Sequence, residues 1–498
     1  AINVTTAATG CGLGLACDTL VSQKLFCCSW LRRRVPLAHR EELYHILRMT
    51  GPLLLSRILS YLLPFVVTMF CGRLGNEVMA GYGLASAQTF GGRNLLQVGV
   101  ILQRSIIILL LFCLPCWGLL INAQPILLCV GQDPEVAIAQ LYITAFLPAV
   151  PAMFLHNLQV SYLQNQGIIL PQLYTAAMAN IANVATNYFF LYWLNLGVGS
   201  AAANTLSQIY ICSFLFAYIR WKKLHVKTWE WSVASLQEWG SYMKLAIPST
   251  LMKCFEWWVY ELGGFLAVLS EEELAAQHAV IMVAFITYMF PLGIQAAACA
   301  RVGNALGAGD TARARLTSKV SLCLAAFAVV EGVVLGCSKT VIGFIFTSDK
   351  IIALVSHLMN AYCFLQFFDG LVGVCTGIFL GTGKQKIPAV ANFVGYYCVG
   401  LTLSVTLMFV AKLRVLFWVG LLVCVILQST FYIIVIFRLN WEKVTEEDGN
   451  PERQGGCEVQ QLKDRHLSTT QLIIRRGLTV LVAVALLAVG TAVHLLVP

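Results

Sequence analysis

The chain contains a series of apolar runs, each long enough to cross a bilayer as a helix. Two examples are VGVILQRSIIILLLFCLPCWGLLI and LLVCVILQSTFYIIVIF. About 20 apolar residues cross roughly 30 Å of hydrocarbon as an α-helix. A helix satisfies its own backbone groups in lipid, and the short alternating segments typical of a membrane β-barrel are not found in the sequence. The sequence therefore predicts an all-α polytopic membrane protein.

Composition supports this class, because 58% of the 498 residues are hydrophobic and only 11% are charged, against about a quarter charged in soluble domains. The 18 cysteines lie mostly inside the apolar runs, and their spacing gives no metal-ligand set. Neither a metal nor another cofactor is expected. Spans are expected near 51–70, 97–121, 139–163, 172–193, 198–219, 245–269, 275–297, 319–337, 352–376, 389–410, 414–437 and 471–497, with residues 2–16 as a further candidate.

The basic residues gather in particular loops, and this pattern predicts the orientation of the chain. They lie at 32–34, 220–227, 301–319, 384–386 and from Arg438 onward, whereas a loop between them carries three glutamates at 271–273. Loops rich in Lys and Arg lie in the cytoplasm. The net charge of +9 therefore reflects membrane topology, and no nucleic-acid partner is expected. The alternation holds through the last eight spans, but one crossing is missing in the N-terminal third.

An internal repeat relates the two halves of the chain. NQGIILPQLYTAAMANIANV resembles GTGKQKIPAVANFVGYYCVG, and aligning Pro171 with Pro388 gives an offset of 388 − 171 = 217. A second pair, Pro52 and Pro248, gives only 248 − 52 = 196. Two related six-helix halves in parallel orientation imply an axis along the membrane normal and a central cleft between two lobes.

The difference between the two offsets points to residues 1–23. If residues 1–22 are moved between Ala87 and Gln88, the second offset becomes 218, and Cys17 aligns with Cys299 at an offset of 217. The move also supplies the missing crossing. We therefore interpret residues 1–23 as the second transmembrane span, displaced to the start of the chain. A genuine N-terminal re-entrant segment is the alternative.

The resulting fold is two pseudo-symmetric six-helix lobes, with 12 spans, plus a C-terminal extra transmembrane helix. The tail between residues 439 and 470 is charged and poor in apolar residues, so we expect a mobile cytoplasmic linker there. The expected segments are a cytoplasmic N-terminal segment (24–50), the N-lobe (51–219), a cytoplasmic inter-lobe loop (220–244), the C-lobe (245–438), the polar tail (439–470) and the extra helix (471–497).

The segment CFEWWVYELGGF holds the clearest candidates for a binding site. Glu256 lies about 11 residues into its expected span, near the bilayer midplane, and Tyr260 shares its helix face. Glu261 lies further toward the outer side, and Trp257 adds aromatic surface. A carboxylate in a low-dielectric cleft can hold a proton, and an organic cation with aromatic faces around it can replace that proton. Such competition is the core of an antiport cycle. The alternative for each glutamate is a structural bond to a neighbouring helix.

Other polar residues in the spans extend this candidate site. Asp369 is a second intramembrane acid beside aromatics, Tyr288 is a further candidate, and Asn3 would be a polar counterpart in the displaced span. Lys253 lies three residues before Glu256, within reach of its carboxylate. Pointing inward, Lys253 would oppose cation binding; snorkelling toward the cytoplasm, it would matter little. The sequence leaves these two arrangements open.

Several motifs carry a resemblance to a known family along nearly the whole chain. They are FCGRLG (70–75), ACDTLVSQ (16–23), VGVILQRS (98–105), QDPEV (132–136), YLQNQGIILPQ (162–172), EWWVYELGGF (256–265), RVGNALGAGD (301–310) and GTGKQK (381–386). Together they resemble the vertebrate multidrug and toxin extrusion (MATE) transporters. In that family ACDTLVSQ follows the first span, which agrees with the displacement inferred from the repeat.

The resemblance implies an antiporter that exports organic cations and xenobiotics in exchange for protons, by alternating access between two lobes. It implies a plasma-membrane protein, apical in epithelia, with membrane lipids around it and a monomeric state. The family's acidic residues fall on Glu256, Glu261 and Asp369, and its span-two asparagine falls on Asn3. The chain departs from the family at Ile281 and Met282, where Tyr-Glu is usual, at Asp369 in place of Glu, and at Lys253 in place of an apolar residue.

Two other function classes are alternatives to a transporter of this kind. A membrane enzyme would need a His, Cys or metal constellation, but His39, His156, His278, His357 and His494 are scattered. The chain is therefore not expected to be an enzyme. A transport-incompetent relative or a lipid flippase on the same scaffold remains an alternative, because Met282 and Lys253 alter the expected site.

Overall fold

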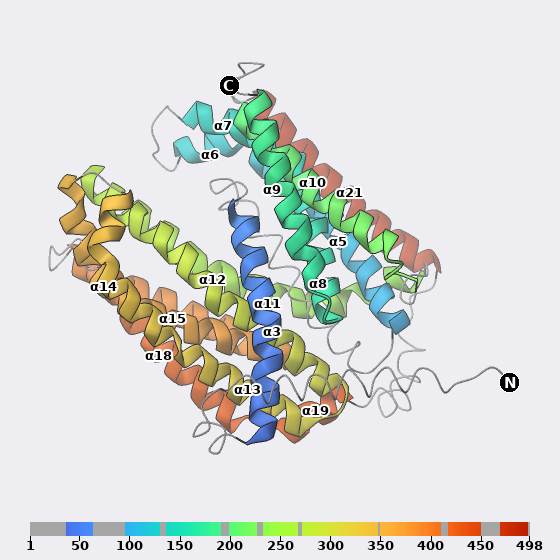
Figure 1. Cartoon of the computed structure of the whole chain (residues 1–498). Helices are drawn as coiled ribbons and strands as arrows, with labels where there is room; N and C mark the ends of the chain where they lie inside the picture. Colours follow the sequence, from blue (N-terminus) through green and yellow to red (C-terminus); the bar gives the residue numbers. More distant parts are fainter. Residues whose placement is uncertain are drawn as a thin grey trace.

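The computed structural model describes residues 36–62, 95–129, 136–190, 199–226, 233–266, 271–346, 349–409, 417–449 and 469–496. Within these ranges the regular structure is helical, with no strand (Figure 1). In this part of the chain, seven segments are long and apolar enough to cross a membrane: Val98–Ile121, Ala202–Trp221, Thr311–Cys337, Val355–Gly381, Lys386–Leu407, Val419–Arg438 and Thr470–Leu496. The prediction of an all-α polytopic membrane protein is confirmed. The opening segment 1–23 lies outside the described residues.

Helices from the first half of the chain pack around a core of their own. They are α5 (Leu95–Ile121), α6 (Ala123–Cys129), α7 (Val136–Phe146), α8 (Ala149–Asn165), α9 (Leu170–Tyr188) and α10 (Gly199–Trp221). The core contains Leu109, Phe154 and Leu215. The span expected at 139–163 is two helices, because the residue before a proline disfavours the helical conformation and the chain turns at Pro148.

Helices from the second half form a separate core. They are α11 (Trp239–Leu266), which follows the short η3 (Val233–Leu236), α12 (Glu271–Gly307), α13 (Thr311–Ala326), α14 (Ala328–Phe346), α15 (Asp349–Gly381), α16 (Lys386–Asn392), η4 (Phe393–Leu401), α17 (Thr402–Phe409), α18 (Phe417–Arg438) and α19 (Trp441–Gly449). Phe379, Tyr396 and Tyr432 are fully buried in this core. Figure 1 shows the two groups as separate bundles, and α11 begins against the first core and ends in the second.

Glycines on α15 bring it close to α12. Gly373, Gly377 and Gly381 are spaced four apart and face α12, so that a methyl group at Gly377 would clash with the carbonyl of Gln295. Small residues at this spacing let two membrane helices approach closely. A methyl group at Gly373 would lie 3.0 Å from the hydroxyl of Tyr288. The glycine therefore leaves room for the Tyr288 side chain beside α15.

The first described helix, α3 (Leu37–Leu62), connects the two bundles. It packs against α9 on one side and against α12 and α13 on the other (Figure 1). Glu42 on α3 accepts two hydrogen bonds of 2.6 Å from the guanidinium of Arg301 and one of 2.7 Å from the hydroxyl of Thr317. The helix begins 14 residues before the span expected at 51–70, because this contact and the buried Ile46 hold its first turns against the C-lobe.

The polar tail differs from its prediction. We expected a mobile linker from 439 to 470, but residues Trp441–Gly449 form α19. Trp441 is 3% exposed, and the hydroxyl of Thr311 donates to that of Thr445 over 2.8 Å. A short amphipathic helix thus packs against α12 and α13, and the prediction of a linker is wrong for this part. Residues 450–468 lie outside the described ranges.

The C-terminal helix α21 (Thr469–Leu496) packs on α5 of the N-lobe (Figure 1). The two helices cross at Gly118 and Gly490, where a methyl group on Gly490 would lie 2.7 Å from the Cα atom of Gly118. The side-chain amide of Asn122 donates to the carbonyl of Gly490 over 2.7 Å. At the other end, Arg476 donates to the carbonyl of Leu236 and lies 4.0 Å from the ring centre of Trp239.

Candidate functional site

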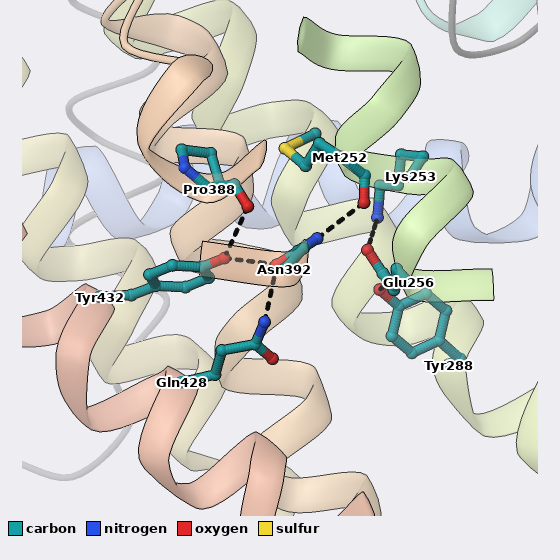
Figure 2. A network of polar contacts seen from close by, with 8 residues as sticks. All are labelled: Met252, Lys253, Glu256, Tyr288, Pro388, Asn392, Gln428 and Tyr432. Carbon is teal, nitrogen blue, oxygen red and sulfur yellow. Dashed lines mark hydrogen bonds and ion pairs between the residues drawn. The ribbon is translucent and has the colours of Figure 1, made fainter. Parts of the chain in front are cut away.

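The carboxylate of Glu256 is buried and both of its oxygens accept hydrogen bonds. The residue is 2% exposed. The ammonium of Lys253 donates to Oε2 over 2.8 Å, and the hydroxyl of Tyr288 donates to Oε1 over 3.2 Å. Figure 2 shows the three side chains converging from α11 and α12. Tyr288, a candidate from the sequence, therefore does contact Glu256.

The ion pair settles the question that the sequence left open about Lys253. Residues three apart lie on the same side of a helix, so Lys253 and Glu256 can meet without distorting α11. Lys253 is 7% exposed, and its ammonium points to Glu256 rather than toward the cytoplasmic surface. This is the arrangement that we expected to oppose cation binding at Glu256 itself.

Asp369 on α15 belongs to the same group of charges. It interacts electrostatically with both Glu256 and Lys253. Gly373 lies one turn further along the same face of α15, where a methyl group would lie 3.0 Å from the hydroxyl of Tyr288. Two carboxylates from different helices are therefore electrostatically coupled to one ammonium, which is hydrogen-bonded to Glu256. With all three groups in their charged forms, the charges sum to −1 − 1 + 1 = −1.

Several other predicted site residues lie outside the described residues. These are Asn3 as a whole, together with the side chains of Trp257, Tyr260 and Glu261, whose backbone belongs to α11. The side chains at Ile281 and Met282, where the chain departs from the family, lie outside them too. The roles assigned to these residues stay predictions.

A second polar cluster, which the sequence analysis did not identify, lies beside the first. The side-chain amide of Asn392, fully buried at the end of α16, donates to the carbonyl of Met252 over 2.7 Å. Its oxygen accepts from Gln428 over 2.8 Å and also from the hydroxyl of Tyr432 (Figure 2). Met252 precedes Lys253 on α11. The cluster therefore ties α16 and α18 to the turn of α11 that carries the ion pair.

The backbone changes its winding at this point. Directly after Asn392 the chain forms the π-helix η4, and π-helical turns are rare and frequently found at functional sites. Phe255, the neighbour of Glu256 in sequence, packs against Phe393 and Tyr397 of η4 with ring centres 5.2 and 5.6 Å apart. Polar residues within the apolar segments AVANFVG and VILQSTFY were the sequence signal for this cluster.

The site has the chemistry of a charge-binding centre in a membrane. It offers carboxylates, an ammonium, a phenol and buried amides, all of which can exchange protons or hydrogen bonds with a small solute. Among the described residues, no three His, Cys, Asp or Glu side chains lie close enough to hold a metal ion. The groups that are present suit a proton or an organic cation.

Comparison with known proteins places this site in a known scaffold. A family model, MatE, matches residues 85–189 and 248–406. The chain is 45% identical over 546 residues to multidrug and toxin extrusion protein 1 of Danio rerio, covering 94% of this chain and 92% of that relative. It is 46% identical over 439 residues to multidrug and toxin extrusion protein 1 of Homo sapiens, covering 82% of this chain and 77% of that relative.

Solved structures show the same fold. The crystal structure of the eukaryotic MATE transporter AtDTX14 matches with a TM-score of 0.79 at 23% identity, covering 82% of this chain and 99% of that one. A MATE transporter in an outward-facing conformation matches with a TM-score of 0.70 at 16% identity, covering 81% of this chain and 97% of that one. Together with the family model and the relatives, these matches mean that the chain belongs to the multidrug and toxin extrusion (MATE) family of transporters.

Proposed function

We propose that this protein is a secondary active antiporter that exports organic cations and xenobiotics in exchange for protons. The observation that carries the proposal is the buried Lys253–Glu256 ion pair, to which the half-buried Asp369 is electrostatically coupled. With all three groups in their charged forms, one negative charge remains uncompensated. Either a proton or a singly charged solute can neutralise that charge, and the two therefore compete for the site.

This mechanism differs from one in which Glu256 acts alone. Because Lys253 already neutralises one carboxylate, proton and cation act on the shared charge of Glu256 and Asp369. Protonation removes the charge and releases the cation, and deprotonation restores the site for the next cation. The proton gradient supplies the driving force, and no cofactor takes part.

Contacts between the lobes support alternating access. The Glu42–Arg301 ion pair and the hydrogen bond from Asn304 to the carbonyl of Asn165 join the two lobes. Arg301 begins one of the basic segments that the positive-inside rule places in the cytoplasm. The lobes are therefore held together at their cytoplasmic ends. A state open to the cytoplasm requires these contacts to break.

The setting of this activity is part of the proposal. The protein would work as a monomer among membrane lipids, in the plasma membrane and in epithelia on the apical side. Its partners would be small organic cations and protons.

The test is proton-driven uptake of tetraethylammonium into proteoliposomes that contain the full chain. We expect uptake by the unmodified protein under an imposed proton gradient. Glu256→Gln and Asp369→Asn should each reduce uptake at least about tenfold, because the remaining carboxylate is then neutralised by Lys253. Glu331→Gln, at an acid on α14 outside this group, is the matched control and should retain uptake. If Glu256→Gln and Asp369→Asn both transport normally, the proposed mechanism is wrong.

One observation favours the alternative of a transport-incompetent relative or a lipid flippase. The 2.8 Å ion pair between Lys253 and Glu256 occupies a carboxylate that a cation would otherwise use. The same liposomes distinguish the alternatives. Proton-driven cation flux excludes the incompetent relative, whereas movement of a labelled lipid without cation flux supports the flippase.

A further inference from the structure

We propose that Lys253 determines the charge of the transported solute, so that the site accepts singly charged organic cations and rejects doubly charged ones. The inference rests on the proposed function and assigns a substrate class to the same site. Lys253 would act as a built-in cation that takes up one of two negative charges. The solute then takes up the other.

The geometry makes Lys253 a fixed part of the site. Its ammonium is buried and lies 2.8 Å from one oxygen of Glu256, while Tyr288 donates to the other oxygen. The absence of a side chain at Gly373 leaves room for the hydroxyl of Tyr288, which would lie 3.0 Å from a methyl group there. Because both oxygens of Glu256 already accept hydrogen bonds, a solute interacts with the combined charge of Glu256, Lys253 and Asp369 rather than with this carboxylate alone.

The elements packed around the group supply few other charges. Asp369 comes from α15, and it is the second acid that interacts with Lys253. Glu331 on α14 and Asp369 both act electrostatically on Tyr362, and Glu331 is not among the charges that act on Asp369. Among the described side chains, the electrostatically coupled charges are therefore those of Lys253, Glu256 and Asp369, and they sum to −1 when all three groups are charged.

This sum explains the selectivity. A singly charged cation brings the buried group to neutrality, as does one proton. A doubly charged cation leaves one positive charge uncompensated in a low-dielectric interior, which is strongly unfavourable. With an apolar residue at position 253 the two carboxylates would sum to −2, and a doubly charged cation would then suit them. An anionic solute is disfavoured in both cases, because the site is negative.

The experiment measures binding to the purified full chain and therefore does not depend on flux. Scintillation proximity with labelled tetraethylammonium and with the doubly charged methyl viologen gives a ratio of affinities. We expect the unmodified protein to bind tetraethylammonium at least about tenfold more tightly than methyl viologen, the same factor as a shift of one pKa unit. Lys253→Met should reduce this ratio at least tenfold, and Lys253→Arg should keep it. Lys244→Met, an exposed lysine on the same helix, is the matched control.

The outcomes separate this inference from the proposed function. Equal affinity of the unmodified protein for both cations, or an unchanged ratio in Lys253→Met, overturns the inference. Binding of neither cation overturns it as well. If Lys253→Met does not fold, the ratio in the unmodified protein and in Lys253→Gln decides. Charge-selective binding without proton-driven uptake in liposomes would instead support the inference about Lys253 and contradict the antiport mechanism.

Discussion

Glu42 and Arg301 form an ion pair with two hydrogen bonds of 2.6 Å, although 259 positions separate them in the sequence. Glu42 lies near the start of α3, and Arg301 lies near the C-terminal end of α12. The hydroxyl of Thr317 on α13 adds a third hydrogen bond to the same carboxylate. This contact joins α3 to α12 and α13, and in the proposed transport cycle it has to open.

Glu42→Gln should therefore weaken the cytoplasmic closure. The substitution leaves the largely buried charge of Arg301 unpaired, and breaking such a pair costs about 3–5 kcal/mol. Hydrogen–deuterium exchange should show faster exchange in peptides covering the first turns of α3 and the start of α13. Glu41→Gln, at the neighbouring half-exposed glutamate, is the matched control and should leave exchange unchanged. Equal exchange in both variants would show that the ion pair does not hold the lobes.

The same pair predicts a pH dependence. Burial by itself would raise the pKa of Glu42, but the hydrogen bonds and charge of Arg301 outweigh it and lower that pKa below its ordinary value of 4.5. Because the pKa of Glu42 is lowered, its ionised carboxylate stabilises the closed state fully at pH values above the ordinary pKa of 4.5. This stabilisation is lost as the pH falls through the lowered pKa. Protection of α3 should thus be constant from about pH 8 to pH 5 and should fall only under more acidic conditions. A loss of protection between pH 8 and pH 6 would contradict this assignment.

Asn392 should be important for stability because three partners depend on it. Asn392→Ala leaves the amide of Gln428, the hydroxyl of Tyr432 and the carbonyl of Met252 without this partner. Each buried polar group that loses its partner costs about 1–3 kcal/mol. We expect the melting temperature of the detergent-solubilised protein, followed by size-exclusion chromatography after heating, to fall by several degrees. Asn187→Ala, at an asparagine bonded only within α9, should change it far less.

The C-terminal helix offers a prediction with an internal control. Gly490→Leu places a side chain where the backbone of Gly118 lies, so α21 should separate from α5. Gly477 is on the same helix, and a methyl group added there would have no atom within 4 Å, so Gly477→Leu should be tolerated. The melting temperature should therefore fall in Gly490→Leu alone. Similar melting of both variants would mean that this crossing does not hold α21.

The sequence predicted the elements of the fold well, because hydropathy and helix length are local properties. The helices expected near 97–121, 198–219 and 471–497 are found within a few residues of these limits. The first turns of α3 and the whole of α19 were missed. Both segments are polar along the chain and are helical because of contacts with α12 and α13, which hydropathy does not report.

The candidate site was predicted in part for the same reason. Glu256, Tyr288 and Asp369 were found because polar side chains in apolar spans are conspicuous. The direction of Lys253 depends on its rotamer and on the packing of α11, so the sequence alone left two arrangements open. The cluster around Asn392 joins three helices, and no local pattern shows that its members meet.

Competition between proton and cation can be measured as the number of protons that leave the protein when a cation binds. Titrating tetraethylammonium into the purified, weakly buffered protein near the midpoint of its pH dependence, with a pH indicator present, gives this number. Competition for a single shared charge predicts release of up to about one proton for each cation bound. Asp369→Asn should bind little cation and release none. Full binding by the unmodified protein without any proton release, across the range from about pH 6 to pH 9, would contradict the account.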